Sequence, residues 1–363
     1  MARIRLDHIR HAYTPELARA GNFALNNIDT AFEDGGAYAL LGPSGCGKTT
    51  LLNIISGLLT PSEGHVYFDR TDVTLLTPEA RNIAQVFQFP VIYDTMTVAE
   101  NLAFPLKNRK VEAREIERRV ADMLKRIGLA DKAGRKARGL TADEKQKISL
   151  GRGLVRSDVN AILFDEPLTV IDPHMKWQLR SELKQLHREF EMTMVYVTHD
   201  QTEALTFADK VVVMYDGEVV QIGTPEELFE RPQHTFVGYF IGSPGMNVLP
   251  CRIEGGEAIV AGERVALPGH SGERRSEKTE LGIRPEFVGV VERGQPGAMP
   301  VTIEKVEDIG SERIVRARLG GERVTAIVRE GASVPGDAAV TFDPNALNLY
   351  ENSRLVARSG GAA

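Results

Sequence analysis

Long apolar runs and clustered cysteines are both missing from this sequence. No window approaches the ~18 consecutive apolar residues that would span a bilayer, and the N-terminal segment Met-Ala-Arg-Ile-Arg-Leu-Asp-His has no apolar signal region. Cys46 and Cys251 lie too far apart for a metal pair and are too few for a disulfide framework. We therefore expect a cytoplasmic protein, and any membrane role would have to come through partners.

An excess of positive charge is also missing. Lys and Arg number 44 against 50 Asp and Glu, a net charge of -6, so the overall field opposes a polyanionic backbone and nucleic acid is not an expected partner. The 363 residues are 42% hydrophobic and 26% charged, which is the composition of a soluble globular protein of two or three domains.

The order of apolar patterns predicts an α/β domain followed by a small all-β domain. Helical patterns separate several short, β-type apolar runs, at 37–41, 84–87, 161–164, 194–197 and 211–215. Charged, helix-forming sequence at about 90–157 predicts a helical subdomain, with apolar residues at helical spacing in 111–127. From residue 236 short strands alternate with Gly and Pro, so we expect domains 1–235 and 236–363.

A phosphate-binding loop follows the first of these runs. Gly42-Pro43-Ser44-Gly45-Cys46-Gly47-Lys48-Thr49 fits the pattern, comes after a predicted strand and opens a helix predicted from Lys48 to about Ser56. A chance glycine-rich turn would not be expected to meet all three conditions. Backbone N–H groups of such a loop face phosphates, Lys48 reaches the terminal phosphates and Thr49 offers a hydroxyl to Mg²⁺. Thr50 completes this candidate nucleotide-binding segment.

Two carboxylates end the run at 161–164. Asp165 is the candidate on the metal side, and Glu166 is the candidate general base for the attacking water. An apolar run ending in Asp-Glu is weak evidence by itself, since such carboxylates often only cap a strand. Together with the phosphate loop it predicts a P-loop NTPase.

These motifs, with Gln88, Asp172 and His199 in matching order and spacing, resemble the ATPase subunit of an ABC transporter. Residues 87–88 and 96–102 are similar to its carbohydrate-importer branch. The segments 236–247, 282–286 and 342–344 resemble the oligonucleotide-binding (OB)-like, TOBE-type regulatory domain of maltose, glycerol-3-phosphate and glycerol importers. The resemblance implies a P-loop ATPase domain with a helical subdomain, followed by a small all-β regulatory domain.

The same resemblance implies roles for four further residues. Tyr13 would stack on adenine, although a Tyr packed on a strand edge is the alternative, because the following segment is longer than usual. Gln88 would sense Mg²⁺ and the terminal phosphate, and Asp172 would lie in a loop at the dimer interface. His199 would contact the terminal phosphate and the attacking water, where a lone His after a strand is otherwise usually structural.

The sequence departs from the family at the signature loop, which the family uses to close over ATP bound to the other subunit. The family's Leu-Ser-Gly-Gly-Gln is replaced by Leu140, Thr141, Ala142, Asp143 and Glu144. Two glycines are lost and two negative charges are gained near a polyanion. Neutral drift is one interpretation; the other is a division of labour in which a second, non-identical ATPase subunit supplies an intact signature.

We therefore expect an ATP- and Mg²⁺-dependent ATPase that energises a binding-protein-dependent importer for glycerol, glycerol-3-phosphate or a related small carbohydrate. The expected partners are two transmembrane permease subunits, a second ATPase subunit and, indirectly, an extracytoplasmic solute-binding protein. Its expected place is the cytoplasmic face of the inner membrane. The alternatives are a nucleotide-binding regulatory protein without a transport role and a GTPase, against which the lack of an Asn-Lys-x-Asp motif argues.

Overall fold

The computed structural model describes residues 2–156, 158–268 and 278–358. The chain divides into two compact units, Met1–Pro225 and Glu226–Ala363. The sequence predicted a domain boundary after residue 235, which is further along the chain than this division, at the start of helix α10 (Thr235–Phe240). That boundary stays a prediction, which a truncation tests below.

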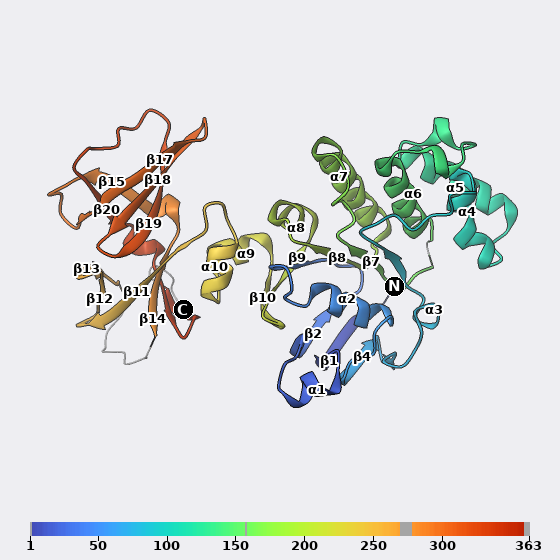
Figure 1. Cartoon of the computed structure of the whole chain (residues 1–363), viewed down its shortest axis with the longest axis horizontal. Helices are drawn as coiled ribbons and strands as arrows, with labels where there is room; N and C mark the ends of the chain where they lie inside the picture. Colours follow the sequence, from blue (N-terminus) through green and yellow to red (C-terminus); the bar gives the residue numbers. More distant parts are fainter. Residues whose placement is uncertain (1, 157, 269–277, 359–363) are drawn as a thin grey trace. The chain divides into compact units, whose positions relative to one another are not determined.

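The first unit is built on a six-stranded sheet (Figure 1). The strand order is β10-β9-β3-β8-β7-β6, and all neighbours pair in parallel except β10 with β9. The strands are β3 (Ala37–Leu41), β6 (Ala84–Val86), β7 (Ile162–Asp165), β8 (Met194–Thr198), β9 (Lys210–Tyr215) and β10 (Glu218–Gly223). Every residue of β3 and β8 is buried, as expected for a parallel sheet covered on both faces. All five predicted runs are strands, with ends shifted by no more than one residue.

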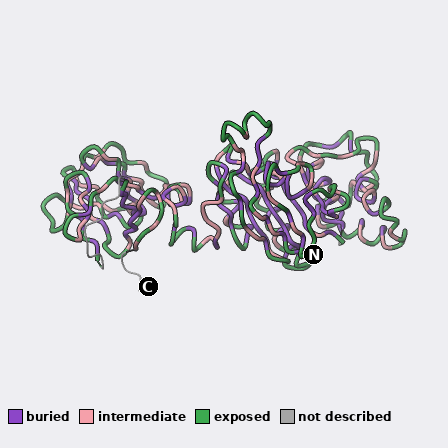
Figure 2. Tube along the Cα trace, turned by 90° about the horizontal axis from the view of Figure 1, so that it is seen from below, coloured by how far each residue is buried: buried purple, intermediate pink, exposed green. Residues whose placement is uncertain are grey.

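A second, antiparallel sheet in this unit has the order β2-β1-β4-β5. Its strands are β1 (Ile4–His11), β2 (Leu25–Phe32), β4 (Glu63–Phe68) and β5 (Thr71–Asp72). Apolar side chains from both sheets and from α2 (Lys48–Ser56) form one core, and Figure 2 shows buried residues following the strands. The predicted helix at 48–56 is confirmed.

The remaining helices of this unit include the expected helical subdomain. They are α1 (Pro15–Arg19), α3 (Pro78–Arg81), α4 (Val98–Asn108), α5 (Ala113–Arg126), α6 (Ala142–Leu154), α7 (Pro173–Phe190) and α8 (Gln201–Phe207). Short 3₁₀ turns lie at Ala130–Lys132 and Ala137–Gly139. Helix α4 packs on both α5 and α6. The helix predicted in 111–127 is α5, which buries Ile116, Val120, Met123 and Leu124 on one face.

Arg81 joins two parts of this unit from a fully buried position. Its guanidinium donates to the carbonyls of Ile54 (2.7 Å) and Ile55 (2.9 Å) in α2, and to those of Thr74 (2.8 Å) and Leu76 (3.0 Å). Burial lowers the pKa of Arg81 to about 10. Arg81 thus adds a donor to two carbonyls at the end of α2, of which that of Ile54 also accepts from the Gly57 N–H at 3.2 Å.

The second unit is a small β domain with its own core. Antiparallel sheets of order β13-β12-β11-β14-β21-β22, β15-β20-β16 and β17-β18-β19 enclose it. The strands are β11 (Asn247–Glu254), β12 (Glu257–Val260), β13 (Glu263–Ala266), β14 (Thr279–Ile283), β15 (Val288–Glu292), β16 (Met299–Pro300), β17 (Thr302–Asp308), β18 (Glu312–Leu319), β19 (Glu322–Arg329), β20 (Ala338–Phe342), β21 (Asn348–Glu351) and β22 (Arg354–Arg358).

Arg284, in a segment that carries the sequence resemblance, is buried in this unit. It donates to the carbonyls of Phe229 (2.7 Å), near the end of helix α9 (Pro225–Glu230), and of Ile241 (2.8 Å), just after α10. Its guanidinium also lies 3.8 Å from the centre of the Phe229 ring. Arg284 therefore fixes the chain that enters the β domain to strand β14.

Candidate active site

The phosphate loop connects β3 to α2, and two of its glycines are required by their surroundings. A Cβ on Gly42 would lie 2.3 Å from the carbonyl oxygen of Met214. Gly47 has φ +99° and a Cβ there would lie 2.7 Å from the carbonyl oxygen of Ala24. No larger residue fits either place without moving the backbone.

Lys48 and the start of α2 provide the loop's positive charge. The buried Lys48 Nζ donates to the carbonyls of Gly42 and Pro43, both at 2.8 Å, and lies 3.7 Å from Sγ of Cys46. Gly47 precedes the helix, so no side chain caps the N–H groups of its first turn. An uncapped helix start beside an ammonium group fits a phosphate.

Tyr13 lies beside this helix with most of its ring exposed. Its hydroxyl is 2.8 Å from Oγ1 of Thr50, and its ring meets His11 edge-on at 5.0 Å between centroids. Tyr13 is 61% exposed, so it is not packed on a strand edge. The unusually long segment after it forms α1.

Asp165 ends β7 within reach of the loop. The Thr49 hydroxyl donates to its Oδ1 at 3.1 Å. Burial raises the pKa of Asp165, and the charge of Glu166 raises it further, whereas the hydrogen bond from Thr49 lowers it. A carboxylate and a hydroxyl held together are oxygen ligands of the kind that Mg²⁺ takes, and a dication would relieve the cost of the buried charge.

Glu166 and His199 come together from neighbouring strands. Oε2 of Glu166 lies 3.1 Å from Nδ1 of His199, which follows β8, and accepts from the Thr169 hydroxyl at 3.3 Å. Glu166 has φ +46°, a left-handed conformation that costs a non-glycine residue about 1–2 kcal/mol. Its N–H donates to the carbonyl of Val197 at 3.0 Å, which fixes the turn. Such strain is typical of functional sites.

Gln88 and Asp172 lie on connecting segments. Gln88 is half-buried, two residues after β6 ends. Asp172 is exposed and caps α7 by accepting from the N–H of His174 at 2.9 Å. Asp172 therefore has a structural role within this chain besides any role at an interface.

The two negative charges that the signature loop gains, Asp143 and Glu144, lie in the first turn of α6. Thr141 caps α6 and exchanges hydrogen bonds with Glu144, while Leu140 is buried and Ala142 is the first helical residue. Asp143 lies 3.3 Å from Nζ of Lys147. Glu144 pairs with Lys132, which, with the Thr141 N–H, lowers the pKa of Glu144. Both added carboxylates thus have a lysine partner within the chain. Lys147 lies one helical turn after Asp143, and Lys132 belongs to a 3₁₀ turn that lies beside Glu144.

Gln146 is a positioning residue that the sequence reasoning missed. Its fully buried amide donates to the carbonyls of Phe87 (3.2 Å) and Pro167 (2.7 Å), the neighbours of Gln88 and Glu166. A signal was present, since Gln146 shares helical spacing with the buried residues Ser149, Leu150 and Gly153.

Glu203 is a second missed residue. The buried carboxylate accepts from the hydroxyls of Tyr196 (3.0 Å) and Thr198 (2.9 Å) at the end of β8. It therefore holds the strand end from which His199 projects. A Glu in the first turn of a helix is usually exposed, so no sequence signal pointed to this contact.

Comparison with known proteins gives the same picture as the geometry. A family model described as ABC transporter matches residues 25–169, and one described as MalK OB fold domain matches residues 242–288. The sn-glycerol-3-phosphate import ATP-binding protein UgpC of Chromohalobacter salexigens is 42% identical over 332 residues, 91% of this chain and 88% of that protein. The chain belongs to the ABC transporter ATP-binding protein family.

Other relatives of this family cover as much of the chain. UgpC of Cereibacter sphaeroides is 40% identical over 97% of this chain and 98% of its own length. The trehalose/maltose import ATP-binding protein MalK of Thermococcus litoralis is 38% identical over 91% and 94%. The solved structure of cbiO1 from Clostridium perfringens, part of the ABC transporter complex cbiONQ, covers 63% of this chain and 90% of its own, with TM-score 0.56 and 27% identity.

This ABC family member is an ATPase, with a P-loop domain followed by an OB-type domain, and it energises an importer together with membrane permease subunits. Its nucleotide is ATP. Over the residues that the structure describes, no helix has the length and apolarity needed to cross a membrane.

Proposed function

We propose that this ATPase drives uptake of glycerol-3-phosphate, glycerol or a related small carbohydrate, from the cytoplasmic face of the inner membrane. The names of the relatives from Chromohalobacter and Cereibacter support the solute class. Purification from membranes with two permease chains is the expected result. A chain that binds ATP but never co-purifies with permeases would instead fit the regulatory alternative.

For the chemistry, we propose that residues 42–50 bind the phosphates, Tyr13 stacks on adenine and Lys48 neutralises the terminal phosphate. Thr49, Asp165 and Gln88 would hold Mg²⁺, which when bound draws charge from the phosphate oxygens. Glu166 would accept a proton from the attacking water while His199 orients the pair. The observation that carries this proposal is the convergence of Thr49 with Asp165 and of Glu166 with His199, both at 3.1 Å.

Mg²⁺-dependent nucleotide binding tests these assignments. Lys48→Ala should weaken ATP binding, and Asp165→Asn should remove its Mg²⁺ dependence, because each change deletes one charge that the phosphates or the metal need. Gln178→Ala, on the exposed face of α7, is a matched surface control and should change neither. Unaltered Mg²⁺ dependence in Asp165→Asn would place the metal on other ligands.

We further propose that a second, non-identical ATPase subunit pairs with this one, with Asp172 at the shared interface. The replaced glycines at Ala142 and Asp143 support this, since a carboxylate ~4 Å from a phosphate charge repels it by about 4 kcal/mol at an effective dielectric of 20. Lys147 offsets part of that repulsion. Each residual ~1.4 kcal/mol is still a tenfold change in binding or rate.

Restoring both glycines tests the pairing. Ala142→Gly with Asp143→Gly should raise hydrolysis by this chain alone and add less in a mixed dimer that already has one complete site. ATPase rate is measured against protein concentration for native and restored chains, with and without the second subunit. A native chain that alone hydrolyses as fast as the mixed dimer would show a functional homodimer and tolerated drift.

A further inference from the structure

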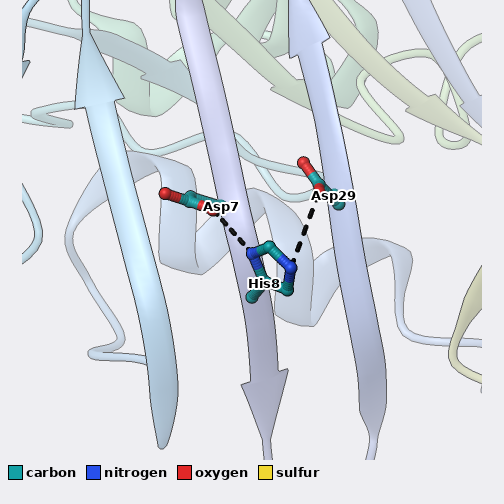
Figure 3. A group of neighbouring side chains, drawn as sticks. All are labelled: Asp7, His8 and Asp29. Atoms are coloured by element: carbon teal, nitrogen blue, oxygen red, sulfur yellow. Dashed lines mark hydrogen bonds and ion pairs between the residues drawn. The ribbon is translucent and has the colours of Figure 1, made fainter.

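Asp7, His8 and Asp29 meet on the antiparallel sheet of the first unit (Figure 3). Asp7 and His8 are successive residues of β1, and Asp29 lies on the paired strand β2. Successive residues of a regular strand point to opposite faces, but β1 has a bulge here and His8 has φ +51°. Gly64 on β4 leaves room for the His8 backbone in this conformation, since a Cβ on Gly64 would lie 2.4 Å from the His8 carbonyl oxygen.

The two ring nitrogens of His8 have different surroundings. Nδ1 lies 2.7 Å from Oδ1 of Asp7, which is a short hydrogen bond. Nε2 lies 3.9 Å from Oδ2 of Asp29, which is too far for one. Figure 3 shows the ring between the two carboxylates, one nitrogen toward each. Asp7 therefore fixes the proton on Nδ1 and leaves the Nε2 lone pair facing a carboxylate oxygen.

A lone pair and a carboxylate oxygen that face each other can both accept from water, but a cation between or on them is attracted by both at once. One candidate is a second proton, and both carboxylates do raise the pKa of His8. The other is a metal ion, for which a tetrahedral site places N and O ligands roughly 3.4 Å apart. The 3.9 Å gap needs only a small side-chain rotation to reach that value, and both side chains are more than half exposed.

We propose that His8 Nε2 and the Asp29 carboxylate bind a divalent transition metal of the Zn²⁺ class, with Asp7 orienting the imidazole. An imidazole nitrogen selects such borderline ions over Mg²⁺. A carboxylate on the other ring nitrogen is the usual arrangement behind a metal-bound histidine. Water completes the coordination at this open surface, and the ion links β1 to β2.

Titration of the full-length chain with Co²⁺, at about pH 8 and in excess Mg²⁺, tests the site, because Co²⁺ bound to nitrogen has a visible absorption spectrum. One equivalent should bind and be displaced by Zn²⁺. His8→Gln and Asp29→Asn should each lose this binding. Asp7→Asn should weaken it by about tenfold or more, as outer partners of ligands do.

His65 provides the matched control. It lies on β4 of the same sheet, and its Nδ1 is 2.9 Å from a single carboxylate, Asp72. His65→Ala should leave Co²⁺ binding unchanged. Zn²⁺ should also raise the melting temperature of the native chain and of His65→Ala, but not of His8→Gln.

Two results would overturn the assignment. The first is no saturable Co²⁺ binding by the native chain, which would leave the proton as the only cation at His8. The second is binding that survives in His8→Gln or is lost in His65→Ala, which would place the metal elsewhere on the sheet.

Discussion

Replacing Glu166 by Gln should stop turnover while leaving ATP binding and folding almost intact. The amide keeps the size of the side chain and can still accept a hydrogen bond, but it cannot take a proton from water. A positioned general base contributes about 10²–10⁴-fold, or roughly 3–5 kcal/mol of the barrier. The contact that is weakened, between residue 166 and a His199 side chain that is 57% exposed, contributes at most about 1 kcal/mol to stability.

The assay compares phosphate release, binding of a fluorescent ATP analogue and urea unfolding for the same preparations. Thr169→Val is the matched control, because it removes the 3.3 Å hydrogen bond to Glu166 but keeps the carboxylate. We expect it to lose less than tenfold in rate, against 10²-fold or more for Glu166→Gln. Near-normal turnover in Glu166→Gln would assign the base to another group, and lost ATP binding would show that Glu166 holds the nucleotide.

Three further predictions concern the folding of the chain. Asp165→Asn should raise the stability of the nucleotide-free chain, because the raised pKa of Asp165 means that its ionised form destabilises the folded state. This gain should shrink as the pH falls, since the native carboxyl then becomes protonated. Thermal melts at a series of pH values measure the difference. Arg81→Leu should lower the free energy of unfolding by about 3–5 kcal/mol in denaturant titrations, since buried carbonyls lose their donor, and Arg81→Lys should recover part of the loss. A chain ending at residue 235 should keep its circular-dichroism spectrum and bind Mg-ATP, because the proposed site residues all precede that boundary; loss of both would show that the boundary is misplaced.

Local patterns predicted the parts of the site that local structure builds. The phosphate loop is a strand, a glycine-rich turn and a helix in direct succession, so its residues carry the whole signal. Asp165 and Glu166 were found because they end a buried apolar strand. Parallel strands bring their carboxyl ends to one edge of the sheet, which is why Glu166 and His199 meet.

Contacts between distant segments gave no such signal. The pairing of Lys132 with Glu144 joins a 3₁₀ turn to a helix, and nothing in either segment specifies the partner. Glu203 lies in the first turn of a helix, where an acidic side chain is usually exposed, and only the packing of α8 on β8 buries it. The left-handed backbone of Glu166 was equally hidden, since no Gly or Asn marks it.

The site combines three features that each oppose folding in the absence of nucleotide. Lys48 is a buried ammonium, Asp165 is a half-buried carboxylate with a raised pKa, and Glu166 holds a left-handed backbone. These costs persist because every residue of β3 and β8 is buried and both strands are paired on each side, so the sheet fixes the positions of the loops. A phosphate would neutralise Lys48 and a dication would neutralise Asp165, so ligand binding removes two of the three costs. The strain at Glu166 has no such relief, so the folded chain bears this cost whether or not a ligand is bound.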